Sequence, residues 1–198
     1  MRGWSDVQGV NRTVLVVAII VVLVLGMGSA VAGTYNRLVT LQTAVDAQWG
    51  QVMVVLQRRN DLIPNLVETV KGFATQERAV IGEVTEARAK LAGAQTTEQQ
   101  VAASNQLDSA LARLLVIVEN YPNIKSDANF RQLMDGLAGT ENRIAVERGR
   151  YNDNVRAYNQ ALLTFPNNIV ARIFGFQPRS YYQATPGSET PPQVNFGG

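Results

Sequence analysis

Residues 14–33 read VLVVAIIVVLVLGMGSAVAG, an apolar run without a charged side chain, and the next charge is Arg37. About 20 such residues in an α-helix span the ~30 Å hydrocarbon core of a bilayer. The apolar region of a signal peptide is usually shorter, about 7–15 residues. Small residues near the end of the run, such as Gly28 and Ala30, keep a cleaved signal peptide open as the alternative. The run predicts an uncleaved, single-pass anchor in the cell membrane over residues 13–34.

Positive charges flank this anchor on both sides. Arg2, Arg12 and the terminal amine precede it, and Arg37 follows it closely. The positive-inside rule favours the side with more positive charge for the cytoplasm. We therefore expect a cytoplasmic N-terminus and an extracytoplasmic soluble domain.

The composition excludes several chemistries. The chain has no cysteine and no histidine, which excludes disulfides, thiolate chemistry, a Ser–His–Asp triad and histidine metal ligands. Neither a Walker A nor a dinucleotide-binding glycine motif occurs. The formal net charge is only +2 and the arginines are scattered among carboxylates, so nucleic acid is not an expected partner. We expect no enzymatic activity, no cofactor and no metal.

Helical periodicity follows the anchor. Apolar residues recur at every third or fourth position in four segments, which begin near Leu38, Ile63, Val101 and Phe130. This spacing gives one apolar stripe per helix, as in coiled coils, and no stretch alternates with the period of a strand. Short connections make successive helices antiparallel neighbours. The sequence predicts an all-α fold in which a transmembrane helix precedes an up-and-down antiparallel bundle of four helices over residues 35–165.

The boundary between the first two helices rests on Pro64. Asn60 and Asp61 are possible N-caps just before it, which favours a turn. The alternative is that Pro64 merely kinks one long helix that starts in the membrane, which leaves three long helices. The other boundary signals, in chain order, are Gly93 at a helix end, Thr96 or Thr97 as an N-cap with Gln99 or Gln100 three residues on, the turn Tyr121-Pro122-Asn123, and Ser126 or Asp127 at a helix start.

The segments outside the bundle differ in composition. Residues 1–12 form a short tail, residues 166–183 form an amphipathic aromatic segment, and residues 184–198 are rich in Pro, Gly, Ser and Thr and are expected to be disordered. Aromatic rings and arginines favour the headgroup zone of a bilayer. A membrane-interface position is one expectation for these aromatics, and capping of the open end of the bundle core is the other. The aromatics are Phe165, Phe174, Phe176, Tyr181 and Tyr182.

Three charged residues fall on the apolar stripes. They are Glu77, Glu141 and Arg148. Charges on a helix seam are costly to desolvate unless they are paired. We expect these three to form a buried structural ion-pair network; the alternative is acid–base chemistry or cation binding by the two glutamates. A second set of charges, Arg58, Arg59 and Asp61, lies at the expected turn, where it is either a partner-binding tip or an ordinary solvated turn.

Several ordered motifs occur together. They are YNRLV at 35–39, Trp49, QRRNDLIPNLVETVKGFATQE at 57–77, YPNIKSDANFRQLMDGLAGTENRIAVERGRYNDNVRAYN at 121–159, and Phe165-Pro166. With these motifs the chain resembles the bacterial LemA family over nearly its whole length up to Tyr182. The resemblance implies a membrane-anchored bundle of four helices and no established enzymatic activity. The family often has His-Glu where this chain has Gln76-Glu77, which weakens any proposal of a metal at that position.

These observations favour a non-enzymatic, membrane-anchored scaffold of the LemA type. The expected partners are the lipid bilayer and either a second copy of the chain or an envelope protein such as a membrane protease. Small residues in the anchor, Gly26-x-x-x-Ala30, permit close helix approach in a homo-oligomer. The alternatives are a membrane-remodelling structural protein and the bundle with acid–base or cation-binding carboxylates.

We predict that the protein purified from membranes keeps its apolar segment. Intact mass spectrometry should therefore give the mass of the full chain, because the uncharged run is long enough to remain as a span. A mature N-terminus near Gly33 contradicts this prediction, because only signal-peptide cleavage produces it.

Overall fold

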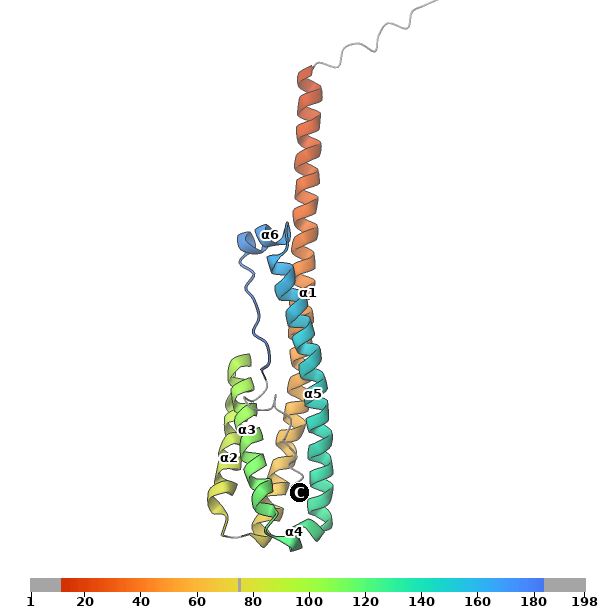
Figure 1. Ribbon diagram of the computed structural model, residues 1–198. Helices are drawn as coiled ribbons and strands as arrows, with labels where there is room; N and C mark the ends of the chain where they lie inside the picture. The colour runs from red at the N-terminus through yellow and green to blue at the C-terminus, as the bar shows by residue number, and fades with distance from the viewer. Residues whose placement is uncertain (1–11, 75, 184–198) are drawn as a thin grey trace, which may run out of the picture. The chain divides into compact units, whose positions relative to one another are not determined.

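The computed structural model describes residues 12–74 and 76–183 (Figure 1). These residues form six α-helices and no β-strand. The all-α class is therefore confirmed, while the predicted N-terminal and disordered tails lie, apart from Arg12, outside the described residues. The helices are α1 (Arg12–Phe73), α2 (Arg78–Gly93), α3 (Thr97–Val118), α4 (Pro122–Ser126), α5 (Ala128–Leu163) and α6 (Asn167–Phe174).

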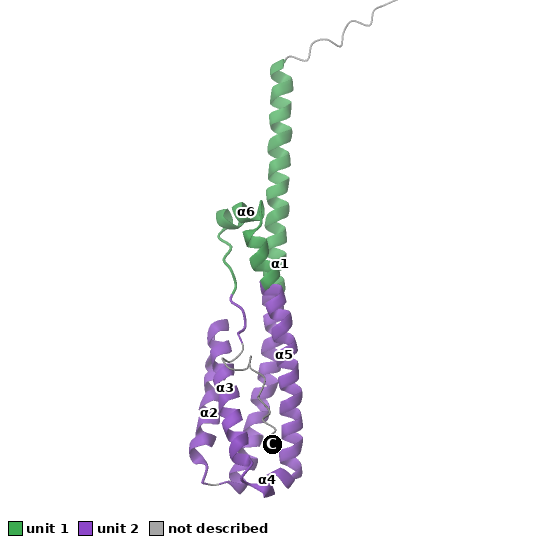
Figure 2. Cartoon of the chain, viewed as in Figure 1, with its two compact units in different colours: residues 1–44, 156–179 green, residues 45–155, 180–198 purple. Residues whose placement is uncertain are grey.

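The chain divides into two compact units (Figure 2). Of the described residues, unit 1 contains 12–44 and 156–179, and unit 2 contains 45–74, 76–155 and 180–183. Helices α1 and α5 each contribute residues to both units. Unit 1 holds the apolar run, and unit 2 holds most of the helical core.

The expected turn at Pro64 is wrong, because α1 continues through Pro64 to Phe73. A proline inside a helix costs about 3 kcal/mol, since it has no N–H to donate to the carbonyl four residues earlier. That carbonyl belongs to Asn60, and it accepts a hydrogen bond from Nε of Arg88 on α2 at 3.1 Å. The neighbours Ile63 and Leu66 are fully buried. A substitute donor and apolar burial offset the cost of the proline, and the chain turns after Phe73 instead.

The later boundaries agree with the sequence. Helix α2 ends at Gly93, and Thr96 caps α3 with a capping box. In that box the Gln99 N–H donates to Thr96 Oγ1 at 3.2 Å, and the Thr96 N–H donates to Gln99 Oε1 at 3.3 Å. The short helix α4 fills the predicted Tyr-Pro-Asn turn, and Asp127 Oδ1 accepts from the Phe130 N–H at the start of α5. Side-chain caps therefore fix the starts of α3 and α5.

The core of unit 2 is a cluster of buried apolar side chains from α1, α2, α3, α4 and α5. Helices α2 and α3 lie side by side as a pair (Figure 1). The members without exposed surface are Ile63, Leu66, Val70, Val84, Leu107, Leu114 and Ile124. Six of them stand on the apolar stripes read from the sequence, whereas Ile124 lies on the short helix α4, between two of those stripes.

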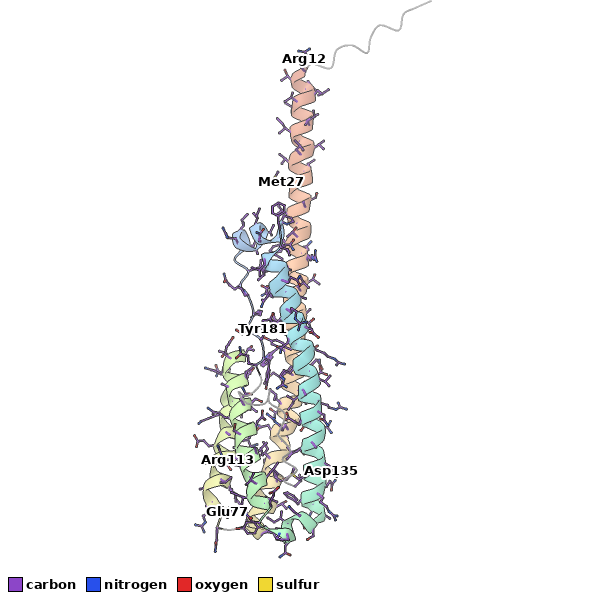
Figure 3. All side chains as sticks on the ribbon, viewed as in Figure 1. Arg12, Met27, Glu77, Arg113, Asp135 and Tyr181 are labelled. Atoms are coloured by element: carbon purple, nitrogen blue, oxygen red, sulfur yellow. The ribbon has the colours of Figure 1, made fainter. Side chains whose placement is uncertain are left out.

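In unit 1 the first part of α1 carries the candidate membrane span. Two described helices, α1 and α3, are long and apolar enough to cross a membrane. Helix α3 buries one face in the core of unit 2, whereas the apolar window of α1 has no buried residue. Its side chains project away from the helix, as Met27 does (Figure 3). The N-terminal half of α1 is therefore the candidate anchor.

Helix α6 and the end of α5 complete unit 1. Gly175, with φ of 74°, ends α6 in the left-handed conformation. This turn lets the Phe176 N–H donate to the Ala171 carbonyl at 3.0 Å. The rings of Phe174 and Phe176 lie 4.9 and 5.7 Å from that of Tyr35 on α1. The predicted amphipathic aromatic segment thus consists of α6 followed by residues without regular secondary structure.

We predict that Arg88→Ala lowers the free energy of unfolding by about 1–2 kcal/mol, because it leaves the Asn60 carbonyl without its partner. Urea unfolding of the full chain in mild detergent measures this. In a Pro64→Ala background the helix supplies its own N–H, so the loss should shrink. Arg113→Ala, which breaks an exposed pair with Glu83, is the matched control and should cost less than about 0.5 kcal/mol. Equal costs in the two backgrounds contradict the assignment.

Candidate functional site

A buried arginine stands at the centre of unit 2. The Arg59 side chain on α1 is only 2% exposed. Its Nη1 donates to the carboxylates of Asp108 on α3 and, at 3.0 Å, Glu141 on α5. Its Nη2 donates to Ser104 Oγ at 2.8 Å. A buried cation is tolerated only where such partners replace water, so Arg59 links α1, α3 and α5 at one level.

Tyr182 covers this centre from the chain's C-terminal segment. Its hydroxyl donates to Ser104 Oγ at 3.0 Å, and its ring lies 5.7 Å from the guanidinium carbon of Arg148. Asn152 on α5 holds the Tyr182 backbone in both directions, with N–H···O distances of 2.8 and 3.0 Å. Burial raises the pKa of the Tyr182 hydroxyl, so this side chain is a neutral donor at physiological pH.

The two carboxylates differ in environment. Burial raises the pKa of the Asp108 carboxyl above its usual range, while the charge of Arg59 acts in the opposite direction. Glu141 is 56% exposed although it bonds to the same guanidinium. The centre therefore has one buried cation shared by a half-buried and an exposed carboxylate. Both carboxylates form ion pairs with Arg59.

A groove opens beside this centre and has a volume of about 480 Å³. Its charged end is formed by Arg59, Asp108, Glu141 and Arg148. The rest is apolar, with Leu66 of α1 between walls from α3 and α5. The wall residues are Leu111, Ala112 and Leu115 on α3 and Met134, Leu137 and Ala138 on α5. The groove has the size and mixed lining of a binding site for a small apolar group or side chains.

The structure separates the three residues of the expected ion-pair network. Glu141 bonds to Arg59 rather than to Arg148. The Arg148 guanidinium lies over the ring of Tyr182. Glu77 accepts a hydrogen bond from the Tyr121 hydroxyl at 3.0 Å, near the α1–α2 connection. None of the three is buried. The buried charge of this core is Arg59, and Glu141 pairs with it instead of with Arg148.

The expected tip of Arg58, Arg59 and Asp61 is also corrected, because there is no turn at Pro64. These residues lie within α1, where Arg58 and Asp61 are exposed and Arg59 is buried. The signal for Arg59 was present in the sequence. It continues the heptad seam that runs Val52, Leu56, Arg59, Ile63, Leu66 and Val70, all of them buried. Treating Pro64 as a helix break hid this seam.

The predicted interface aromatics fall into two groups. Phe165, Phe174 and Tyr181 are 80%, 52% and 44% exposed, and Phe176 is half-buried. Tyr182 is instead 3% exposed and belongs to the Arg59 centre. Its membrane-interface assignment is therefore corrected, because its hydroxyl has a buried partner in Ser104.

These features define an all-helical protein with a candidate N-terminal membrane anchor. Its described residues contain no group of three or more His, Cys, Asp or Glu that could hold a metal ion. The chain belongs to the LemA family, whose model matches residues 48–196. This confirms the resemblance seen in its motifs.

Individual relatives are more distant. Magnetosome protein MamQ of Magnetospirillum gryphiswaldense is 27% identical over 91% of this chain and 77% of its own length. Magnetosome protein MamQ 2 of Paramagnetospirillum magneticum is 28% identical over 79% of this chain and 67% of its own. Protein LemA of Metamycoplasma hominis is 22% identical over 77% and 70%. The similarity extends along most of each chain.

We predict that Arg59→Ala lowers the free energy of unfolding by about 3 kcal/mol, because it leaves Asp108 without its partner and opens a cavity in the seam. Arg58→Ala is the matched control, since the neighbouring arginine is exposed, and should change stability by less than about 0.5 kcal/mol. Arg59→Met, which keeps most of the volume, should fall between them. Urea unfolding in detergent measures these changes. Equal free energies of unfolding for Arg58→Ala and Arg59→Ala contradict the assignment of Arg59 as the buried, paired arginine.

Proposed function

We propose that this protein is a non-enzymatic, membrane-anchored scaffold whose groove binds an amphipathic helical segment of another envelope protein. The observation that carries the proposal is the groove, which joins an apolar channel to a charged end. The candidate anchor keeps unit 2 at a membrane, with the N-terminus on the cytoplasmic side under the positive-inside rule. The family relation agrees with this function and does not name the partner.

The carboxylates of the groove support a binding role over catalysis. Catalytic acids and bases need a group that can exchange its proton with a substrate. Asp108 and Glu141 both bond to Arg59, whose burial depends on them. The raised pKa of Asp108 is the one observation that favours acid–base chemistry. Burial of the Asp108 carboxyl is sufficient to raise its pKa, and the neighbouring Arg59 charge acts in the opposite direction.

The apolar walls favour a helical occupant. On α3 the wall residues and Asp108 stand at i, i+3, i+4 and i+7, and the same spacing runs from Met134 to Glu141 on α5. Ala112 and Ala138 are small, which leaves room for larger side chains from outside. An apolar helix face inserted between two helices is a recurring mode of peptide recognition, with anchors at the same spacing.

The charged end adds a preference for an acidic residue on the partner. Asp108 and Glu141 are both bonded to Arg59. Arg148 lines the groove, and its guanidinium lies over the ring of Tyr182. A partner carboxylate near Arg148 would gain a charge-assisted hydrogen bond at the edge of an apolar surface. The proposed occupant is therefore a segment with an apolar face and an acidic residue at one end.

Because the chain lacks cysteine, single substitutions can report on the groove. We predict that Ala112→Cys, inside the groove, reacts with a maleimide about tenfold more slowly in native membranes than in purified protein, if about nine grooves in ten are occupied. Val116→Cys is the matched control on the same helix, 65% exposed and outside the groove, and its rate should not change. A gel shift with a polymer-linked maleimide measures both rates.

Charge reversal sharpens the test. Arg148→Glu should restore the fast reaction of Ala112→Cys in membranes, whereas Arg143→Glu on the exposed part of α5 should not. Protection that persists in purified protein means that the chain fills its own groove and contradicts the proposal. Protection that appears when purified protein is concentrated in liposomes identifies a second copy as occupant and contradicts it as well. Equal rates in all preparations show an empty groove.

A further inference from the structure

We propose that the outer face of α6 lies on the surface of an acidic phospholipid bilayer and gives unit 1 a second membrane contact beside the candidate span. This inference goes beyond the docking groove, which belongs to unit 2. It rests on the exposure of α6, on its contact with α1 and on the charges of unit 1.

Helix α6 is apolar on more than the side that it buries. Its inner side is formed by Asn167, Val170 and Ala171, which are buried. Large apolar side chains on its outer side are exposed, and so are two apolar side chains just before the helix begins. The outer-side residues are Ile169, 51% exposed, and Ile173, 69% exposed, and the two that precede the helix are Leu163 and Phe165, each 80% exposed; Phe174 follows on the buried side of α6 and is 52% exposed. Clustered exposure of this kind marks a surface that contacts a partner or a membrane.

The place of α6 on α1 points to lipid. Tyr35 is two residues beyond Gly33, where the apolar run ends. From Thr13 to Gly33 the helix rises ~30 Å, the thickness of a hydrocarbon core. The rings of Phe174 and Phe176 lie against Tyr35, and α6 stands beside α1 at this level (Figure 1). If the run spans a bilayer, α6 lies at its interface.

The charges of unit 1 favour acidic lipid in particular. Residues 12–44 and 156–179 contain five arginines and no aspartate or glutamate. The arginines are Arg12, Arg37, Arg156, Arg172 and Arg179. Residues 45–155 contain carboxylates and basic residues in mixture. The described part of unit 1 is therefore cationic around a helix of bilayer length, which makes it complementary to anionic headgroups.

The arrangement fits known interfacial chemistry. Arg172 is exposed on the outer side of α6, near Ile169 and Ile173. An arginine at this position places its guanidinium among phosphates while its methylene stem and the neighbouring apolar side chains enter the acyl boundary. Tyrosine and phenylalanine rings occupy the same zone.

Single cysteines test the contact in the full chain reconstituted into liposomes. Ile173→Cys carries an environment-sensitive fluorophore on the outer face. Asn168→Cys is the matched control on the polar edge of the same helix, and Val146→Cys, 52% exposed in unit 2, is the control for water. We predict that the label at 173 shifts its emission to the blue and is quenched by nitroxide lipids in phosphatidylcholine–phosphatidylglycerol vesicles. The label at 168 should respond less, and the label at 146 not at all.

The outcomes separate lipid from other partners. In pure phosphatidylcholine, or with Arg172→Glu, the quenching at 173 should fall, because headgroup charge contributes to the contact. A label at 173 that behaves like that at 146 shows the face in water and overturns the proposal. A blue shift without lipid quenching, dependent on the protein-to-lipid ratio, means that a second copy covers the face and also overturns it. Circular dichroism confirms that each variant keeps its helices.

Discussion

The buried guanidinium of Arg59 is the constraint on which unit 2 depends. An arginine withdrawn from water destabilises a fold unless fixed acceptors surround it. Here the acceptors come from α3 and α5, at sequence separations of 49 and 82 residues. Shifting either helix by one turn would move its carboxylate by about 5.4 Å and leave the cation unpaired. The ion pairs therefore select one register among many that the apolar stripes alone would allow.

Asn60, the residue after Arg59, places a similar polar constraint on α2. The carbonyl of Asn60 lacks its usual donor because residue 64 is proline, and Arg88 of α2 supplies one. Two consecutive residues of α1 thus set polar requirements that α2, α3 and α5 must meet. Proline, which usually ends a helix, here creates an acceptor that a neighbouring helix can recognise. Apolar packing supplies most of the stability, and these polar contacts specify the alignment.

Local chemistry and distant contacts differ in how far a sequence reveals them. The cap of Thr96 and Gln99, the end at Gly93 and the start at Asp127 depend on residues within four positions, and they were predicted correctly. The fate of Pro64 depends on an arginine 28 residues from the carbonyl it serves, so no local rule could decide it. That single error moved Arg59 from a core seam to an imagined surface turn. The groove depends on how three helices assemble, and no stretch of sequence encodes that directly.

Two Tyr-Asn pairs stand seven residues apart in α5, Tyr151-Asn152 and Tyr158-Asn159, and both asparagines bind main chain. Asn152 binds both the N–H and the carbonyl of Tyr182, and Asn159 does the same to Arg179, with distances of 2.8 to 3.0 Å. Because these amides bind backbone atoms, the hydrogen bonds do not depend on which side chains residues 179 and 182 carry. Seven residues of helix advance ~10.5 Å, and three extended residues cover nearly the same length. The two spacings match, so substitutions between residues 179 and 182 should be tolerated, whereas an insertion or deletion there would break one pair of these hydrogen bonds.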